Sequence, residues 1–228
     1  MKISKSIREK YKNIDPELDV FIYNFDMPEG STILEVGAHD NPVSIMLAES
    51  GFKVHGVDLR EYDCGTHENY THHMMNFLQL PQEFIKKYVG TFDAVICVSA
   101  IEHFGLGTYS DKTYNPYADV AATINIYNLL KEHGYFYLTT PFGGRYMEVR
   151  PHWKVYDFAE LFYRFGINLN MDAFSIRCAE KITLLGKTFE IGDSVDLQSA
   201  LANLNGAPSI CSFARFWKPP LNKIGEKK

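Results

Sequence analysis

The sequence predicts an α/β protein with a mostly parallel, twisted β-sheet, helices on both faces and an antiparallel C-terminal strand. Three observations support this prediction. Short apolar runs rich in β-formers alternate with amphipathic segments between residues 32 and 140, Gly or Pro marks most of the boundaries, and two further strand-like runs follow near the C-terminus. Repeated strand–helix units of this kind are typical of a sheet that carries helices on both faces.

The first strand–helix–strand unit is the clearest part of the pattern. Its first apolar run ends at Gly37 and its second ends at Asp58. Between the two runs, Asn41 is placed to cap a helix, Pro42 suits the first helical position, and Gly51 follows the last turn. We expect two parallel strands here, joined by a right-handed crossover.

The alternation continues along the chain. An N-terminal helix is expected to begin near Asp15. Later elements are expected as a helix over 82–88, a strand over 92–98, a helix over 119–131 stopped at Gly134, a strand over 135–139, a helix capped at Asp157 and ended at Gly166, a strand over 171–176, a helix over 194–204 and a strand over 210–216.

Composition indicates one globular domain. The chain has 228 residues, of which 46% are hydrophobic and 22% are charged, and no repeat or Gly/Pro-rich linker divides it. We therefore expect a single domain over residues 1–228. It would comprise an N-terminal helical cap at 1–30, a ligand-binding core at 31–170, and C-terminal strands with a helical insertion at 171–228.

Net charge, hydropathy and cysteine spacing argue against a nucleic-acid-binding, membrane-spanning or secreted protein. The formal net charge of −5 argues against a protein that binds duplex nucleic acid through its phosphates. No apolar run approaches the ~20 residues that cross a bilayer, and the charged first residues do not resemble a secretion signal. The four Cys are scattered, as free thiols in a cytoplasmic protein are. We expect a cytoplasmic protein without membrane or nucleic-acid partners, and the sequence leaves open a homo-oligomer.

The predicted strands place a ligand site at their carboxyl ends. Gly37 lets the backbone approach a ligand where a Cβ would collide, and Asp58 follows about 20 residues later, the separation at which an acidic side chain meets ribose hydroxyls. Ala38, His39 and Asp40 stand where a dinucleotide-binding loop has further glycines, which disfavours NAD or FAD. Each residue taken alone could be a turn residue, but together they favour a nucleoside without phosphates.

Several motifs resemble those of class I S-adenosylmethionine-dependent methyltransferases. They are residues 33–38 (ILEVGA), 54–58 (VHGVD), 92–95 (FDAV), 99–103 (SAIEH), 129–135 (LLKEHGY) and 152–156 (HWKVY). The resemblance covers about residues 30–170 and implies a Rossmann-like methyltransferase fold. Residues 101–109 also resemble a poorly characterised methyltransferase-like subfamily.

The resemblance implies a set of residues that bind S-adenosylmethionine. By this likeness, the methionine moiety would lie against Glu35, Gly37 and Ala38, the ribose against Asp58, the adenine against Leu59, Asn76 and Phe77, and Ser99 would face the cofactor. Asn76 departs from the family, which more often has Asp there, although an amide can still hydrogen-bond the exocyclic amine.

Methyl transfer to a hydroxyl or amine is helped by a base that removes the acceptor's proton. His103 directly follows the fourth predicted strand and is the first candidate, His152 is the second, and Glu102 could orient either imidazole or lie by the cofactor. A structural role remains the alternative for each of the three.

Three other groups of residues are open to a functional or a structural interpretation. The long connection over 104–117 contains three Tyr and could form a lid. Arg145, Arg150 and Lys154 could bind an anionic acceptor or form a solvated face. Metal-ligand types cluster at Asp63, Cys64, His67, Glu68, His72 and His73, but their spacing matches no closed zinc pattern, so we expect no metal.

The sequence thus predicts an S-adenosylmethionine-dependent methyltransferase that acts on a hydroxyl or amine of a small molecule, for example a sugar, a nucleotide-sugar or another metabolite. The alternative is a non-catalytic protein that binds the same cofactor as a partner or sensor. A nucleotide-dependent oxidoreductase is disfavoured by the missing glycines.

Overall fold

The computed structural model describes residues 3–12, 14, 16–39, 41–109, 112–204 and 209–220. Asp15, expected near a helix start, and Asp40, expected in the loop after the first strand, lie outside these residues. The two ends of the expected 1–228 domain lie outside them as well.

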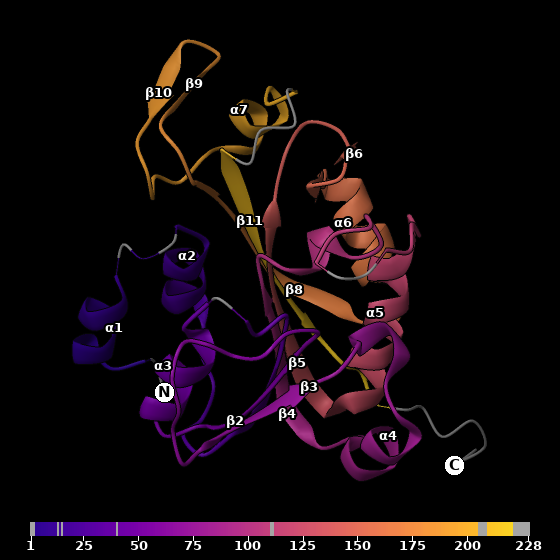
Figure 1. Cartoon of the computed structure of the whole chain (residues 1–228). Coiled ribbons are helices and arrows are strands. Elements are labelled where there is room, and N and C mark those ends of the chain that lie inside the picture. The colour runs from indigo at the N-terminus through magenta and orange to yellow at the C-terminus, as the bar shows by residue number, and fades with distance from the viewer. Residues whose placement is uncertain are drawn as a thin grey trace, which may run out of the picture.

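One seven-stranded sheet forms the centre of the molecule (Figure 1). Its strands, in spatial order, are β3 (Tyr70–Met74), β2 (Lys53–Asp58), β1 (Thr32–Val36), β4 (Phe92–Val98), β5 (Leu130–Pro141), β11 (Ile210–Trp217) and β8 (Asn170–Cys178). Strands β1 to β5 are parallel, and β11 pairs antiparallel with both β5 and β8. This arrangement confirms the predicted mostly parallel sheet with an antiparallel C-terminal strand.

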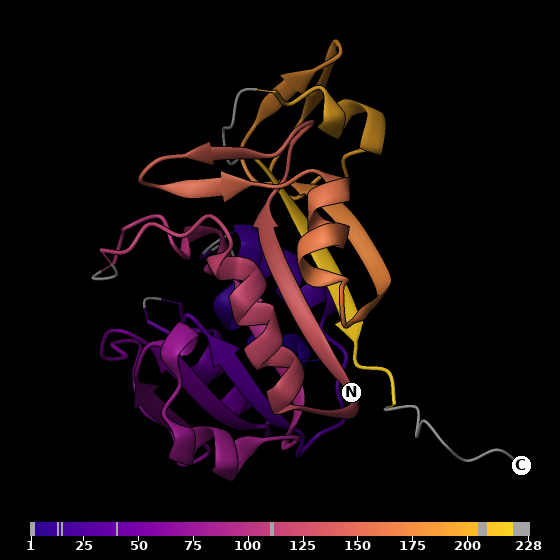
Figure 2. The same ribbon diagram turned by 90° about the vertical axis from the view of Figure 1, so that its right-hand side faces the viewer.

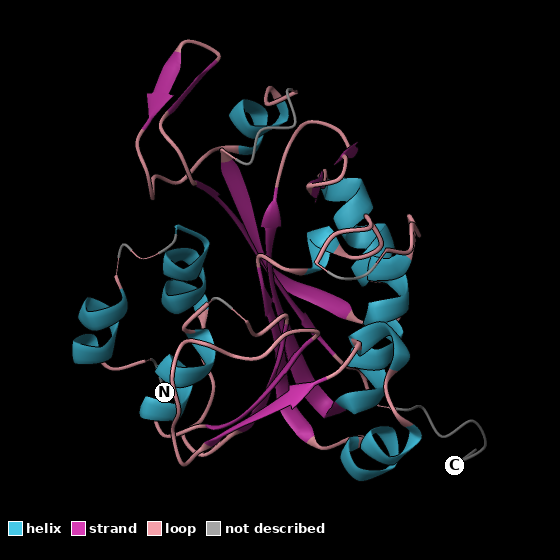
Figure 3. Ribbon diagram, in the orientation of Figure 1, coloured by secondary structure: helices cyan, strands magenta, loops and turns pink. Residues whose placement is uncertain are grey.

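Helices cover both faces of the sheet (Figure 3). One face carries α1 (Lys5–Tyr11), α2 (Pro16–Asn24) and α3 (Val43–Glu49), and the other carries α4 (Gln82–Tyr88), α5 (Ala118–Leu129) and α6 (Phe158–Phe165). Central strand β4 is apolar on both sides because Ile96 and Val98 join the core under α2 and α3, whereas Val95 and Cys97 join the core under α5 and α6.

Smaller elements complete the described chain. They are the 3₁₀ turns η1 (Phe77–Gln79) and η2 (Ile101–His103), the hairpin of β6 (Met147–Val149) and β7 (Trp153–Val155), the hairpin of β9 (Ile182–Leu184) and β10 (Lys187–Phe189), and α7 (Leu197–Leu201). The sequence did not predict the hairpins. Figure 2 shows the β6–β7 hairpin projecting beside the connection that follows η2.

The expected helix over 119–131 is too long at its C-terminus. Helix α5 ends at Leu129, and Leu130 already pairs with Phe92 in the sheet. The ammonium of Lys218 donates hydrogen bonds of 2.8 Å to the carbonyls of both Tyr127 and Leu130. A cation on the last carbonyls stabilises a helix end. Lys218, which lies far along the chain, therefore favours a helix that ends at Leu129 rather than at residue 131.

The expected helix over 194–204 is also shorter in the structure. Before α7, Ser194 forms a β-bridge with Arg177, and the amide of Val195 donates to the carbonyl of Ile176. The Asp196 carboxylate then caps the helix by accepting from the amide of Ser199 at 2.9 Å. The helix begins only after this cap because the preceding backbone is paired with β8.

A buried carboxylate joins several elements on one face of the sheet. Asp119, in the first turn of α5, is fully buried. Its carboxylate accepts from Arg164 of α6 at 3.0 Å and from the Tyr156 hydroxyl at 2.8 Å, and it lies 3.3 Å from the ammonium of Lys154 on β7. Burial lowers the pKa of Lys154, and the charge of Asp119 opposes that shift.

The same two cations also hold the connection between η2 and α5. Lys154 donates to the carbonyl of Phe104 at 2.8 Å, and Arg164 donates to the carbonyl of Pro116 at 2.9 Å. Both ends of the 104–117 connection are therefore tied to the Asp119 cluster, which fixes where that connection crosses the molecule.

Asp119→Asn should lower the free energy of unfolding by about 3–5 kcal/mol, because it leaves two buried cations without their shared anion. Urea unfolding followed by circular dichroism measures this change. Asp172→Asn is the matched control, since Asp172 pairs with Arg215 near the surface and should cost about 1 kcal/mol at most. Equal losses in the two variants would contradict the structural role of Asp119.

Burial lowers the pKa of two histidines on adjacent strands, His55 and His73. Nδ1 of His55 on β2 lies 3.0 Å from Nε2 of His73 on β3, and the two rings are stacked. Rings of Tyr88 and Phe92 pack against His55. Burial lowers the pKa of His55 to about 4 from an ordinary 6.5, with smaller effects of His73 and Lys87.

Because the folded chain resists protonation of His55 while the unfolded chain accepts it, stability should fall as the pH drops from about 6.5 to about 4. His55→Gln should flatten this decline, as measured by urea unfolding across that pH range. His152→Gln, at an exposed imidazole, is the control and should leave the decline unchanged. An unaltered slope in His55→Gln would refute the assignment.

Candidate functional site

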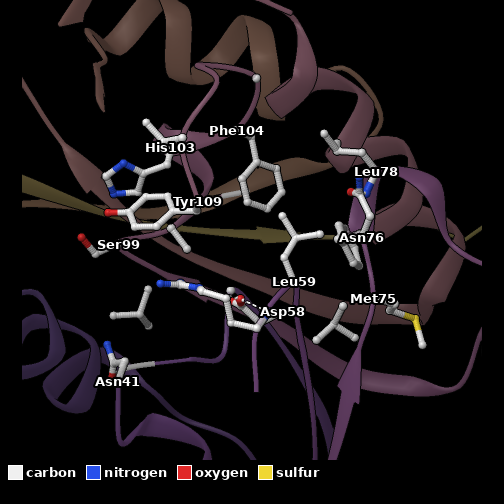
Figure 4. Close-up of a pocket in the computed structure, with 18 of the residues that line it drawn as sticks. Asn41, Asp58, Leu59, Met75, Asn76, Leu78, Ser99, His103, Phe104 and Tyr109 are labelled. Atoms are coloured by element: carbon white, nitrogen blue, oxygen red, sulfur yellow. Dashed lines mark hydrogen bonds and ion pairs between the residues drawn. The ribbon is translucent and has the colours of Figure 1, made fainter. Parts of the chain in front are cut away.

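A cavity of about 430 Å³ opens at the carboxyl ends of β1, β2 and β4 (Figure 4). Its walls come from the strand ends, from the segment after β3 and from the connection after η2. The lining residues that the sequence pointed to are Gly37, Asp58, Leu59, Asn76, Phe77, Ser99 and His103. A volume of this size suits a small-molecule ligand.

Gly37 allows the ends of β1 and β4 to approach each other. Its φ is +87°, and a Cβ there would lie 2.3 Å from the Cβ of Ala100. Its amide donates to the carbonyl of Val57 at 2.9 Å. A side chain at this position would therefore be strained and would push the two strand ends apart.

Asp58 is the acidic residue at the end of β2. Its Oδ1 accepts from the amide of Arg60 at 2.9 Å and from the Nε of the same residue at 3.1 Å, and its Oδ2 lies 3.5 Å from a terminal nitrogen of Arg60. The guanidinium also lies over the ring of Tyr109, 4.7 Å from its centre. The carboxylate of Asp58 and the guanidinium of Arg60 thus form an ion pair between two residues that line the cavity.

The segment after β3 supplies an amide and apolar surface. The Oδ1 of Asn76 accepts from the amide of Leu78 at 2.9 Å and so caps η1. Phe77 is buried, whereas Leu59 is 37% exposed. Figure 4 shows Asn76 and Leu78 on one side of the view and Ser99 and His103 on the other.

Ser99, at the end of β4, has an unusual backbone. Its φ is +49°, which a non-glycine residue adopts only when its surroundings hold it there. Its amide donates to the Oγ1 of Thr139, and its hydroxyl donates to Oε1 of Glu102, each at 3.0 Å. The strained turn directs the chain from β4 into η2.

His103 lines the cavity with a defined tautomer. Its Nδ1 makes a short hydrogen bond with the carbonyl of His152. A carbonyl only accepts hydrogen bonds, so Nδ1 carries the proton and Nε2 holds the lone pair in the neutral ring. Nε2 lies 3.7 Å from Oε1 of Glu102, and the ring meets Tyr109 edge to face.

Four of the sequence-predicted site residues do not line this cavity. Glu35 is buried behind it and accepts from the hydroxyl of Ser44. Ala38 is buried against Gly56. Glu102 is buried beneath His103, and His152 contributes its backbone carbonyl.

The connection over 104–117 contributes part of the wall. A Cβ on Gly105 would lie 2.0 Å from the carbonyl oxygen of Asn115, and Leu106 bridges to Tyr114. Of its three Tyr, only Tyr109 lines the cavity. The hydroxyl of Tyr114 instead donates to Glu148 at 2.9 Å.

Arg145, Arg150 and Lys154 lie outside the cavity. Lys154 belongs to the Asp119 cluster, and Arg150 pairs with Glu148 at 3.1 Å. The six residues over 63–73 whose side chains could bind a metal do not form a site either. Within the described ranges, no group of three or more His, Cys, Asp or Glu is placed to hold a metal ion.

Arg60, Met75 and Leu78 also line the cavity, although the sequence did not indicate them as site residues. Arg60 had a local signal, since it follows Asp58 by two residues. The others could not be identified because only the folded chain brings them to the end of the sheet.

The strand order and the position of the cavity define a Rossmann-like class I methyltransferase fold. The chain belongs to the family described as Caenorhabditis protein of unknown function, DUF268, whose model matches residues 32–199. No curated protein sequence matches it.

Solved structures share the fold at low sequence identity. The 1,6-didemethyltoxoflavin-N1-methyltransferase of Burkholderia thailandensis, with bound 1,6-didemethyltoxoflavin and S-adenosylhomocysteine, is 13% identical, with a TM-score of 0.57 over 94% of this chain and 79% of that one. An S-adenosylmethionine-dependent methyltransferase of Mesorhizobium loti is 12% identical, with a TM-score of 0.58 over 90% and 99%. A TehB-like one of Corynebacterium glutamicum is 14% identical, with a TM-score of 0.55 over 94% and 93%.

None of the helices in the described part of the chain is long and apolar enough to cross a membrane.

Proposed function

We propose that this protein is an S-adenosylmethionine-dependent methyltransferase that acts on a hydroxyl or amine of a small molecule. The observation that carries the proposal is the convergence of Gly37, Asp58, Asn76 and Ser99 on one cavity at the carboxyl ends of the parallel strands. The fold shared with S-adenosylmethionine-dependent methyltransferases supports it.

The lining residues fit the cofactor's nucleoside. Asp58 would accept hydrogen bonds from the ribose hydroxyls, Asn76 would bind the adenine edge, and Leu59 and Phe77 would contact its faces. Glu35 and Ala38 would support, from behind, the loop against which the methionine moiety would lie. The single glycine of the loop favours a nucleoside over a dinucleotide, whose pyrophosphate needs close backbone approach at several points.

The bound cofactor would supply a methyl group on a sulfonium, which is already activated for in-line displacement. The chain's contribution is then to align the acceptor and to take up its proton. His103 would accept that proton at Nε2, because its Nδ1 already donates to the carbonyl of His152. The carbonyl of His152 would orient the ring, and Glu102, whose Oε1 lies 3.7 Å from Nε2, would stabilise the charge that the ring gains.

A second candidate is a non-catalytic protein that binds the same cofactor. In both candidates Arg60 occupies the carboxylate of Asp58, so cofactor binding there competes with an existing ion pair. The two candidates differ in whether loss of His103 removes an activity or leaves a binding protein unaltered.

Asp58→Ala should weaken binding of S-adenosylhomocysteine about 30-fold or more, since it removes charge-assisted hydrogen bonds to the ribose. Isothermal titration calorimetry measures the affinity, with NAD as the dinucleotide that should not bind. Asp172→Ala, at a carboxylate that also pairs with an arginine, should bind like the wild type. Absence of binding by the wild-type protein would overturn the proposal.

His103→Asn should lower turnover about 100-fold or more with an acceptor found by screening for S-adenosylhomocysteine release. The Asn amide can still donate to the carbonyl of His152, but it offers no basic nitrogen. Binding of S-adenosylhomocysteine should stay within about threefold of the wild type. Unchanged turnover would show that His103 is not the base.

A further inference from the structure

Arg60 is a cation that lines the cavity, and the methyl-transfer mechanism proposed above gives it no role. It is the only Lys or Arg among the lining residues that the structure describes, and Asp58 is the only Asp or Glu among them. The Arg60 side chain is 30% exposed and the Asp58 side chain is 8% exposed. The two groups therefore set the charge that the cavity presents to a ligand.

Cofactor binding would compete with Arg60 for Asp58. An ionised carboxylate has about four lone-pair sites. Oδ1 already accepts from the amide and the Nε of Arg60, at 2.9 and 3.1 Å, and Oδ2 has only the longer 3.5 Å contact. Because a ribose diol donates one hydrogen bond to each oxygen, it would displace the side-chain Nε from Oδ1.

The displaced guanidinium would stay inside the cavity. It lies 4.7 Å from the centre of the Tyr109 ring, and that ring lies 5.1 Å from the ring of His103. Arg60, Tyr109 and His103 thus form a continuous row from the ribose position to the proposed base. A cation on an aromatic face, without its carboxylate, attracts an anion to this row.

We propose that Arg60 binds an oxyanion of the methyl acceptor, either a carboxylate or a phosphate, and that ribose binding at Asp58 releases the guanidinium for this role. The planar fork of arginine suits both anions. This inference rests on the proposed function. It makes the acceptor an anionic small molecule and makes its binding cooperative with that of the cofactor.

The test measures coupling between the cofactor product and a simple oxyanion. S-adenosylhomocysteine is titrated by calorimetry with and without inorganic phosphate, with ionic strength held constant by chloride. Phosphate should tighten binding about fivefold or more in the wild type. Arg60→Met should abolish this effect without weakening the affinity measured in chloride, because the competitor for Asp58 is also removed.

A second ligand separates the two sources of an oxyanion. 5′-Methylthioadenosine has the nucleoside and the thioether but lacks the amino-acid carboxylate. Phosphate should tighten binding of both ligands if Arg60 serves the acceptor. If phosphate tightens only 5′-methylthioadenosine, Arg60 binds the cofactor's own carboxylate, and the inference is overturned.

Arg215→Met is the matched control. Arg215 also makes two hydrogen bonds to an aspartate, Asp172, and lies over the ring of Tyr135, but it is outside the cavity. This variant should retain the full effect of phosphate. If Arg215→Met loses the effect equally, or if wild-type protein binds S-adenosylhomocysteine without responding to phosphate, the inference fails while the proposed function stands. If the wild type binds neither nucleoside, both fail.

Discussion

The buried charge of Asp119 is the constraint on which the arrangement around the cavity depends. A carboxylate without solvent must be compensated where it lies, and here its partners come from α6, from β7 and from Tyr156. The same cations bind carbonyls at both ends of the 104–117 connection. One electrostatic requirement thus determines where the β6–β7 hairpin meets η2 and, with it, the position of His103.

The cavity itself joins two kinds of structure. Its floor consists of strand ends that are fixed by the sheet, where Gly37 and Ser99 adopt positive φ. Its other walls are irregular segments that are held by side chains, as Tyr109 is by Arg60 and His103. The sheet fixes the floor, whereas walls from connecting segments can differ between proteins with the same fold.

Much of the fold was predictable because its signals are local. The boundaries of β1, α4 and β4 agree with the sequence pattern, since strand and helix periodicity appear within a few residues. The ends of α5 and α7 were not predictable in this way. The first is capped by Lys218 from far along the chain, and the second is delayed by pairing with β8. Both hairpins were missed because their strands are only three residues long.

The sequence by itself determined the α/β class and the positions of Gly37 and Asp58 at strand ends, because spacing along two short strands decides which residues end at the same edge. Only the tertiary structure decided which groups meet there. It put the carbonyl of His152 on the Nδ1 of His103, 49 residues away, and the guanidinium of Arg60 between Asp58 and Tyr109. Such contacts depend on how separate elements pack, and no local pattern in the chain records that packing.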